Sequence, residues 1–232
     1  MRRVPRRRAG APRETRRTGS GAGTRERLLD AAARLFAERG FTHVTVRQIA
    51  REAHANIAAV SYHFRDKLGL YTAVVQRAVA EVRRTSDAAI QAGAGGTPEE
   101  ALRRYVRASL LAIEQQPHLA WTHKLLRHEM SEPTPAAPLI VEQAILPRIR
   151  FLGGIVAELL GCAPTDPRVR RGVLSIQAQV AFLLGLARAP APFRALVVPD
   201  WPLSVAQSEA LADHIAVFSL AGVRALAAPV DA

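Results

Sequence analysis

The sequence has 232 residues, of which 49% are hydrophobic and 22% charged, so it is not a wholly disordered chain and suits one or two globular domains. Its net charge of +12 lies entirely before residue 86, with +7 on residues 1–23 and +5 on residues 24–85. The single cysteine, Cys162, excludes an intrachain disulfide and a thiolate metal cluster. We therefore expect a cytoplasmic protein without metal or cofactor. We also expect no membrane contact, because no apolar run reaches the ~18 residues that a membrane span needs.

The first 23 residues are rich in Arg, Pro and Gly and have no hydrophobic centre. This composition is typical of a disordered basic arm and excludes a secretory signal. Such an arm could follow the minor groove or flanking phosphates of DNA, or it could be a solvated tail.

Residues 24–85 predict a compact helical domain. The segment TRERLLDAAARLFAERG has an apolar stripe that includes Leu28 and Phe36, and Gly40 suits the left-handed turn that ends a helix. Thr45 can cap a short helix over TVRQIAREA. Asp66 can cap a later helix, which places Lys67 in its first turn.

Between these caps, the segment from His54 to Phe64 predicts a turn followed by a second short helix. Asn56 can cap this helix, and the spacing of Ile57, Val60 and Phe64 predicts that these three side chains face the core. The opposite face has only small or hydrogen-bonding side chains and no acid. Its members are Asn56, Ala58, Ala59, Ser61, Tyr62 and His63.

Two short helices joined in this way are typical of a helix-turn-helix, whose second helix enters the major groove. Small side chains let a helix approach the base edges, while hydroxyl, imidazole and cationic groups can bind phosphates. The candidate DNA-binding residues are Thr45, Arg47, Asn56, Ile57, Ala59, Ser61, Tyr62, His63 and Lys67.

After a flexible break at residues 92–96, a capping box at Thr97 predicts the start of a second helical domain over residues 97–228. Further helices are expected over 118–130, about 139–160 with a kink at Pro147, 167–187 and 204–226. The last two are amphipathic, the later one through Leu211, Ile215, Phe218 and Leu226, and they lie beyond an already complete domain. They therefore predict either a partner surface or part of one monomeric core.

Polar and aromatic side chains on the middle helices could line a ligand cavity, although large apolar side chains at helical spacing usually fill a core. His118, His123 and His128 are five residues apart, which turns each imidazole by ~140° around a helix and excludes a shared metal ion. The candidate ligand-binding residues are Trp121, His123, Arg127, Met130, Gln177, Gln179 and Phe182.

The order AERGF, TVRQIAREA, YHF and DKLGLY resembles the N-terminal domain of the TetR family of bacterial transcription regulators, from about Thr24 to Val82. The form NIAAVSYHF is similar to the CecR-like branch, as are EQQPHLAWTHKLLRHEMSEPT, VEQAILPRIRFL and DPRVRRGVLSIQAQVAF. One departure is His54, where the family usually has glycine. Histidine tolerates positive φ better than most residues, so the turn remains possible.

The resemblance implies an all-α fold with an N-terminal three-helix DNA-binding domain and a C-terminal ligand-binding and dimerisation domain. It also implies a homodimeric repressor that binds double-stranded DNA at a near-palindromic operator and responds to a small-molecule effector. Activation of transcription is an open alternative, as is a basic helical protein that binds nucleic acid without sequence preference. The sequence has no GxSxG, HExxH or phosphate-loop motif, so we do not predict an enzyme.

Overall fold

The computed structural model describes residues 20–114 and 120–227, which are helical without strands, so the all-α prediction is confirmed. Most of the predicted arm and His118 lie outside these ranges, and residues 20–23 belong to the first helix. The elements are α1 (Ser20–Arg39), α2 (Val46–Glu52), α3 (Ala58–Phe64), α4 (Lys67–Gly93), α5 (Pro98–Glu114), α6 (Ala120–Ser131), α7 (Ala137–Ile140), the π-helix η2 (Val141–Ile145), α8 (Leu146–Leu160), α9 (Pro167–Ala187), α10 (Ala191–Val197) and α11 (Val205–Ala227).

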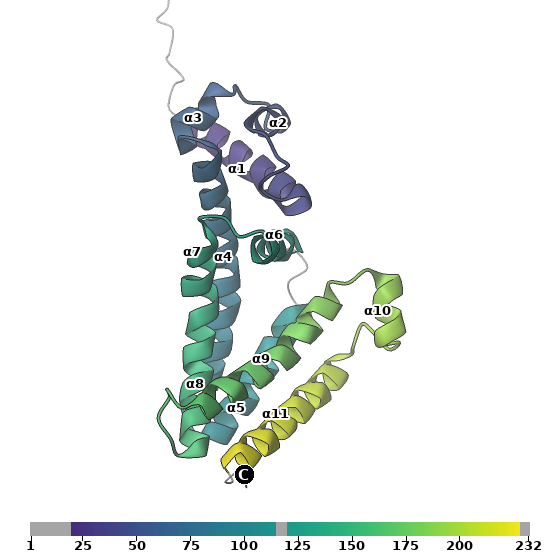
Figure 1. The fold of residues 1–232 in the computed structure, drawn as a ribbon. Coiled ribbons are helices and arrows are strands. Elements are labelled where there is room, and N and C mark those ends of the chain that lie inside the picture. The colour runs from purple at the N-terminus through teal and green to yellow at the C-terminus, as the bar shows by residue number, and fades with distance from the viewer. Residues whose placement is uncertain (1–19, 115–119, 228–232) are drawn as a thin grey trace, which may run out of the picture.

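The first core lies between α1, α2, α3 and the N-terminal part of α4, at the top of Figure 1. Leu28 and Phe36 of α1 are fully buried there, as the apolar stripe predicts. The ring of Phe36 meets the edge of Tyr71 at 4.9 Å between centroids. These contacts hold α1 against the long helix α4.

Helix α4 joins the two ends of the molecule, because its buried side chains extend from Leu70 to Gly93. Its last turns pack in a second core with α5, α8, α9 and α11. Gly93 is required there, since a Cβ atom would lie 2.8 Å from the ring of Phe151. Thr97 and Glu100 then form the predicted capping box, with the backbone N–H of Glu100 donating to Thr97 Oγ1 at 3.3 Å.

Helices α6 and α7 follow α5 in the chain but pack on the first core. Leu125 and Ile140 are buried in the same cluster as Phe36 and Tyr71. The two ends of the molecule are therefore connected by α4 and also by α6 and α7. A boundary between residues 85 and 97 separates the chain less cleanly than its composition indicates.

The interruption predicted at Pro147 takes the form of the π-helix η2. The backbone N–H of Leu146 donates to Val141 O, one residue further back than in an α-helix. Proline has no N–H to donate, and its ring would clash with the carbonyl four residues earlier. The wider turn before Pro147 accommodates both effects.

The late helices have a buried side and an exposed apolar side. Ile176 and Ile215 are buried in the second core, whereas Phe182 of α9 is 63% exposed and Phe218 of α11 is 64% exposed. Phe218, a member of the apolar stripe of the last helix, is exposed because α11 faces the core through Ile215 and through smaller residues such as Ala212 and Ala216.

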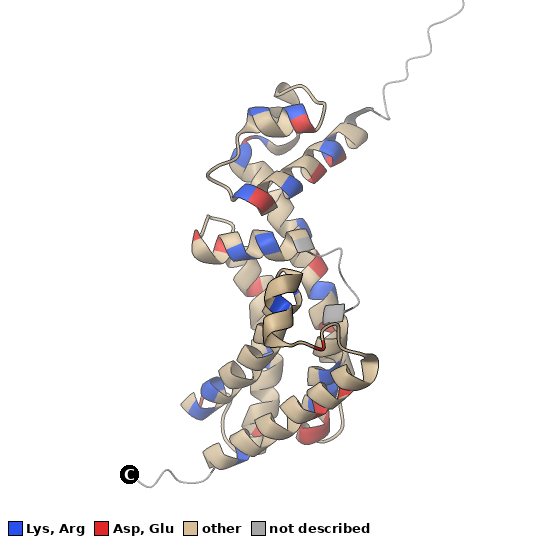
Figure 2. Ribbon diagram, turned by 90° about the vertical axis from the view of Figure 1, so that its right-hand side faces the viewer, with Lys and Arg blue, Asp and Glu red and all other residues tan. Residues whose placement is uncertain are grey.

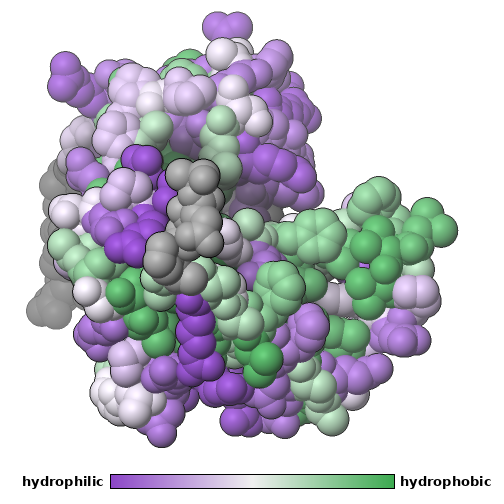
Figure 3. All heavy atoms as spheres, turned by 60° about the horizontal axis from the view of Figure 1, so that its bottom comes forward, coloured by the Kyte–Doolittle hydropathy of each residue, from purple (hydrophilic) through white to green (hydrophobic). Residues whose placement is uncertain are grey.

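Helix α10 was not predicted, because its seven residues are too short to show a period. It too is exposed, with Leu196 at 84%, and apolar residues gather at this side of the molecule in Figure 3.

Helix α11 is, contrary to expectation, long and apolar enough to cross a membrane by length and composition alone. One side of it packs against α5, α8 and α9, and 33% of its most apolar stretch is buried.

Candidate nucleic-acid interface and ligand pocket

A complete capping box fixes the start of α2. The backbone N–H of Gln48 donates to Thr45 Oγ1 at 3.3 Å, and the backbone N–H of Thr45 donates to Gln48 Oε1 at 2.8 Å. Thr45 therefore orients α2 through its hydroxyl. Arg47, one residue into the helix, is exposed.

The turn between α2 and α3 is a Schellman motif centred on His54. The N–H of Ala55 donates to Ala50 O at 2.9 Å and the N–H of His54 donates to Arg51 O at 3.1 Å, which are the two bonds of that motif. His54 has φ of 49°, the left-handed conformation that glycine usually supplies. The histidine therefore keeps the turn geometry that the sequence requires.

Local contacts also fix both ends of α3. At its start, the backbone N–H of Ala58 donates to Asn56 Oδ1 at 2.9 Å. At its end, the N–H of Arg65 donates to Ser61 O at 3.1 Å. Helix α4 follows at once, and the N–H of Gly69 in its first turn donates to Asp66 Oδ1 at 2.7 Å. A Cβ atom on Gly69 would lie 2.1 Å from Phe64 O, so only glycine allows α4 to begin this close to α3.

Helix α3 presents its small and polar side to solvent. Tyr62 is 84% exposed, Ser61 and Ala58 are exposed, and Ala59 and His63 are half-buried. Ala59 packs in part against the first core, so Ala58 and Ser61 lie nearer the middle of the exposed side.

The prediction that Ile57 faces the core is wrong, since 47% of its surface is exposed. The helix begins at Ala58, and Ile57 lies in the cap before it, where helical spacing does not decide which way a side chain points. Val60 and Phe64 are buried as the spacing predicts.

Lys67 lies at the first turn of α4, and Asp66 caps this helix as predicted. Its ammonium is 4.3 Å from the centroid of the Phe41 ring, and partial burial lowers the pKa of Lys67. A contact between Lys67 and a phosphate stays a prediction, and it requires the side chain to leave this ring.

The charge near α3 favours an anionic partner. No Asp or Glu occurs between His54 and Arg65. On α2, Glu52 is paired with Arg34 of α1 at 3.6 Å, while Arg47 is in none of the ion pairs among the described residues. Figure 2 shows basic and acidic residues together on the helices of this domain, whereas α3 itself has no Lys, Arg, Asp or Glu.

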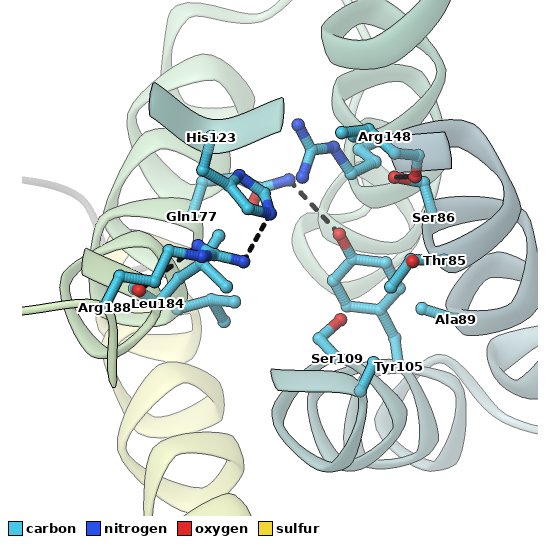
Figure 4. Close-up of a pocket in the computed structure, with 13 residues that line it drawn as sticks. Thr85, Ser86, Ala89, Tyr105, Ser109, His123, Arg148, Gln177, Leu184 and Arg188 are labelled. Carbon is cyan, nitrogen blue, oxygen red and sulfur yellow. Dashed lines mark hydrogen bonds between the residues drawn. The ribbon is translucent and has the colours of Figure 1, made fainter. Parts of the chain in front are cut away.

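The second candidate site is a pocket of about 70 Å³ between α4, α5, α6, α8 and α9. Its apolar lining is Val82, Ala89, Ala112, Val180 and Leu184. Its polar lining is Thr85, Ser86, Tyr105, Ser109, His123, Arg148, Gln177 and Arg188. Figure 4 shows these side chains arriving from separate helices around one space.

Two of the candidate ligand-binding residues, His123 and Gln177, line this pocket. The others lie elsewhere: Met130 is 77% exposed, Phe182 faces outward, and Arg127 is exposed. Trp121 packs against the first core, and Gln179 donates to Ser219 Oγ at 3.1 Å.

Arg148 and Arg188 line the pocket although no sequence pattern predicts it. No spacing along the chain connects them, because they come from α8 and from the residue that ends α9. Tyr105 of α5 is buried in the second core, and its hydroxyl also reaches the pocket and accepts from Gln177 Nε2 at 3.3 Å.

His123 is held neutral by its neighbours. Burial, together with the charges of Arg188 and Arg148, lowers the pKa of His123 to about 4. Arg188 hydrogen-bonds to Nε2 of His123, and because arginine can only donate, this nitrogen accepts. His123 therefore has its proton on Nδ1 at neutral pH.

Helix α6 connects this pocket to the first core. His123 lies in the pocket, and Glu129, six residues or ~9 Å further along the helix, is 3% exposed beside α4. Glu129 accepts from the Tyr71 hydroxyl and, at 2.7 Å each, from the backbone N–H and hydroxyl of Thr134. Helix α6 therefore contacts both the pocket and α4, the helix that begins beside α3.

Among the described residues, no three His, Cys, Asp or Glu side chains come together as a metal site would require. His123 and His128 lie on the same helix without a shared centre.

In comparisons with known proteins, both halves of the chain match families of bacterial transcription regulators. A family described as the C-terminal domain of the HTH-type transcriptional dual regulator CecR matches residues 98–223. A family described as bacterial regulatory proteins, tetR family, matches residues 28–74. The HTH-type transcriptional dual regulator CecR of Shigella flexneri is 30% identical over 177 residues, which cover 72% of this chain and 79% of that protein.

Solved structures of similar fold include a transcriptional regulator from Pseudomonas aeruginosa PAO1, with a TM-score of 0.63, 19% identity and coverage of 87% of this chain and 92% of that one. AibR in complex with isovaleryl coenzyme A and operator DNA has a TM-score of 0.58 and 19% identity, with coverage of 84% and 97%. At this identity the likeness concerns the fold alone.

Proposed function

We propose, from the premise that this chain belongs to the TetR family of bacterial transcription regulators and to its CecR-like branch, that it is a homodimeric repressor. It is a DNA-binding regulator and not an enzyme. In the proposed mechanism, two copies bind a near-palindromic operator in the cytoplasm, and a small molecule in the pocket releases them.

The exposed side of α3 is the observation that best supports a specific contact with DNA. Ala58 and Ser61 are small enough to let the helix approach base edges, and Tyr62 and the half-buried His63 can reach the phosphates beside the groove. The fixed turn at His54 and the close approach at Gly69 hold this helix in one orientation. We infer that α3 is the recognition helix.

The exposed apolar sides of α9 and α11 support a dimer. Leu174, Phe182, Val217 and Phe218 are each more than half exposed, a cost that a second copy would remove. Gly185 and Gly222 have open space at their Cβ positions, which allows a partner helix to come close. Two such pairs of helices would form a four-helix bundle between two copies.

A dimer would place two recognition helices in successive major grooves, roughly 34 to 36 Å apart. An effector releases the protein only if it binds better to a dimer whose recognition helices have another spacing. Helix α6 is the proposed route, because it contacts the pocket through His123 and α4 through Glu129.

A mobility-shift assay with Ala58→Glu tests the groove contact. The exposed position tolerates the change in the folded protein, but a carboxylate there would face the DNA, so operator binding should fall at least 100-fold. Ala163→Glu is the matched control, because this exposed residue lies between α8 and α9 at the far end of the molecule (Figure 1). Normal operator binding by Ala58→Glu would contradict the proposal.

Excess random DNA in the same assay separates a sequence-specific regulator from a non-specific basic protein. A specific complex should persist, whereas a complex held by phosphate contacts alone should be lost to the competitor. In vitro transcription from the bound promoter then distinguishes repression from activation.

A further inference from the structure

The pocket between α4, α5, α6, α8 and α9 has two guanidinium groups, neither of which forms an ion pair with an acidic side chain in the part of the chain that the structure describes. Arg148 and Arg188 both line it, and Figure 4 shows them extending into the same space from opposite sides. Among the described residues that line the pocket there is no Asp or Glu. Two positive charges therefore lie together in a partly closed space.

The contacts of both arginines leave their charge uncompensated. Arg148 Nε donates to Ala144 O at 3.0 Å, and Arg188 Nη1 donates to Leu184 O at 3.2 Å. The third contact is from Arg188 to the neutral His123. Carbonyl oxygens and an imidazole satisfy hydrogen bonds but supply no negative charge.

Burial of these charges has a cost that a bound anion would remove. Although part of Arg188 reaches solvent, burial lowers the pKa of its guanidinium to about 10. An oxyanion between the two guanidinium groups would gain charge-assisted hydrogen bonds, for which the planar arginine group is suited.

The remainder of the pocket fits an apolar body. Val82, Ala89, Val180 and Leu184 line it from α4 and α9. The hydroxyl of Tyr105 and the amide of Gln177 bond to each other, so part of the polar lining is already satisfied. A wholly polar ion would leave the apolar residues without a partner.

We propose that the pocket binds a small organic acid, with its oxyanion between Arg148 and Arg188 and its apolar body against α4 and α9. This inference deepens the proposed function, on which it rests, by giving the chemical class of the effector. Such a pocket would exclude cations and would bind a neutral molecule of the same shape more weakly than the anion.

Isothermal titration of the full-length protein with two matched pairs of probes tests this proposal. Benzoate is compared with benzamide, and octanoate with octanamide, because each pair differs little except in charge. At least one anion should bind tenfold or more tightly than its amide. Equal affinity within both pairs, or binding of none of the four probes, would overturn the proposal.

Substitutions locate the anion. Arg148→Met and Arg188→Met should each weaken the binding of the preferred anion at least fivefold and that of its amide less than twofold. Arg150→Met is the matched control, since it removes the same charge from an exposed position on α8, and it should leave both affinities unchanged. Arg148→Lys keeps the positive charge and should retain part of the preference for the anion over its amide. This result would show that the loss in Arg148→Met comes from the missing charge and not from a failure to fold.

An anion preference that survives in both Met variants would place the binding elsewhere and contradict the proposal. A mobility-shift assay on the same preparations separates this result from failure of the proposed function. Anion binding by a protein that ignores operator DNA would remove the repressor and keep the pocket assignment. Operator binding without anion preference would remove the pocket assignment and keep the repressor.

Discussion

Tyr71→Phe should destabilise the protein measurably, because it removes one of the donors to a buried carboxylate. Glu129 is 3% exposed and accepts from the Tyr71 hydroxyl and from two groups of Thr134. Loss of a hydrogen bond to a buried charged group costs about 1.5–3 kcal/mol. For a chain of this size, the melting temperature should fall by roughly 3 to 12 °C.

Thermal unfolding at pH 7, followed by circular dichroism, measures this effect. Tyr62→Phe is the control, because the Tyr62 side chain is 84% exposed, and its melting temperature should change little. The reasoning is refuted if Tyr71→Phe melts no lower than Tyr62→Phe. A double-mutant cycle with Glu129→Gln should then show coupling between Tyr71 and Glu129, as residues that share one bond do.

Burial, together with the bond to Glu129 and its charge, also raises the pKa of Tyr71 well above its usual value near 10. The folded protein therefore keeps this proton at a pH where the unfolded chain has lost it. Its contribution to stability is complete below pH 10 and declines as the pH rises further. This part of the alkaline decline should be absent from Tyr71→Phe.

Three further results are expected. Gly69→Ala should push α4 away from Phe64 O, and it should therefore reduce operator binding in a mobility-shift assay more than it reduces helix content in circular dichroism. Operator binding equal to that of the unchanged protein would mean that α3 tolerates the shift. Phe182→Glu should yield monomers in light scattering while Ala163→Glu remains dimeric, and a dimeric Phe182→Glu would exclude the exposed side of α9 as the interface. The pKa of His123 is lowered to about 4 in the folded state, so the unfolded chain takes up a proton first and the protein loses stability as the pH falls from about 6.5 to about 4. This part of the loss should be absent from His123→Gln. Acid unfolding that is the same in both proteins would show that His123 is not held neutral.

The helices of the first domain could be predicted well from the sequence, because the features that start and end them depend on residues close together in the chain. Caps at Thr45 and Asp66, the stop at Gly40 and the positive φ of His54 each depend on a few neighbouring residues. The exception is Ile57, where a cap residue was counted as part of the helix.

The pocket could be predicted only in part, since it is made where five helices meet. His123 and Gln177 were found as polar residues on helices expected in the core, but the same criterion also selected Met130, which is exposed. The packing of α6 against the first core decides which of its sides faces the pocket. That packing depends on Leu125 and Glu129 meeting α1 and α4, contacts that no local spacing reveals.

A nuclease footprint on the DNA beside this gene tests the central claim most directly, since many such regulators control their neighbours. The account predicts one protected site with two similar half-sites, about one helical turn apart, occupied by two copies of the chain. It also predicts that Ala58→Glu leaves this site unprotected. Protection by a single copy, or no preferred site at all, would contradict the claim that α3 reads DNA twice in each assembly.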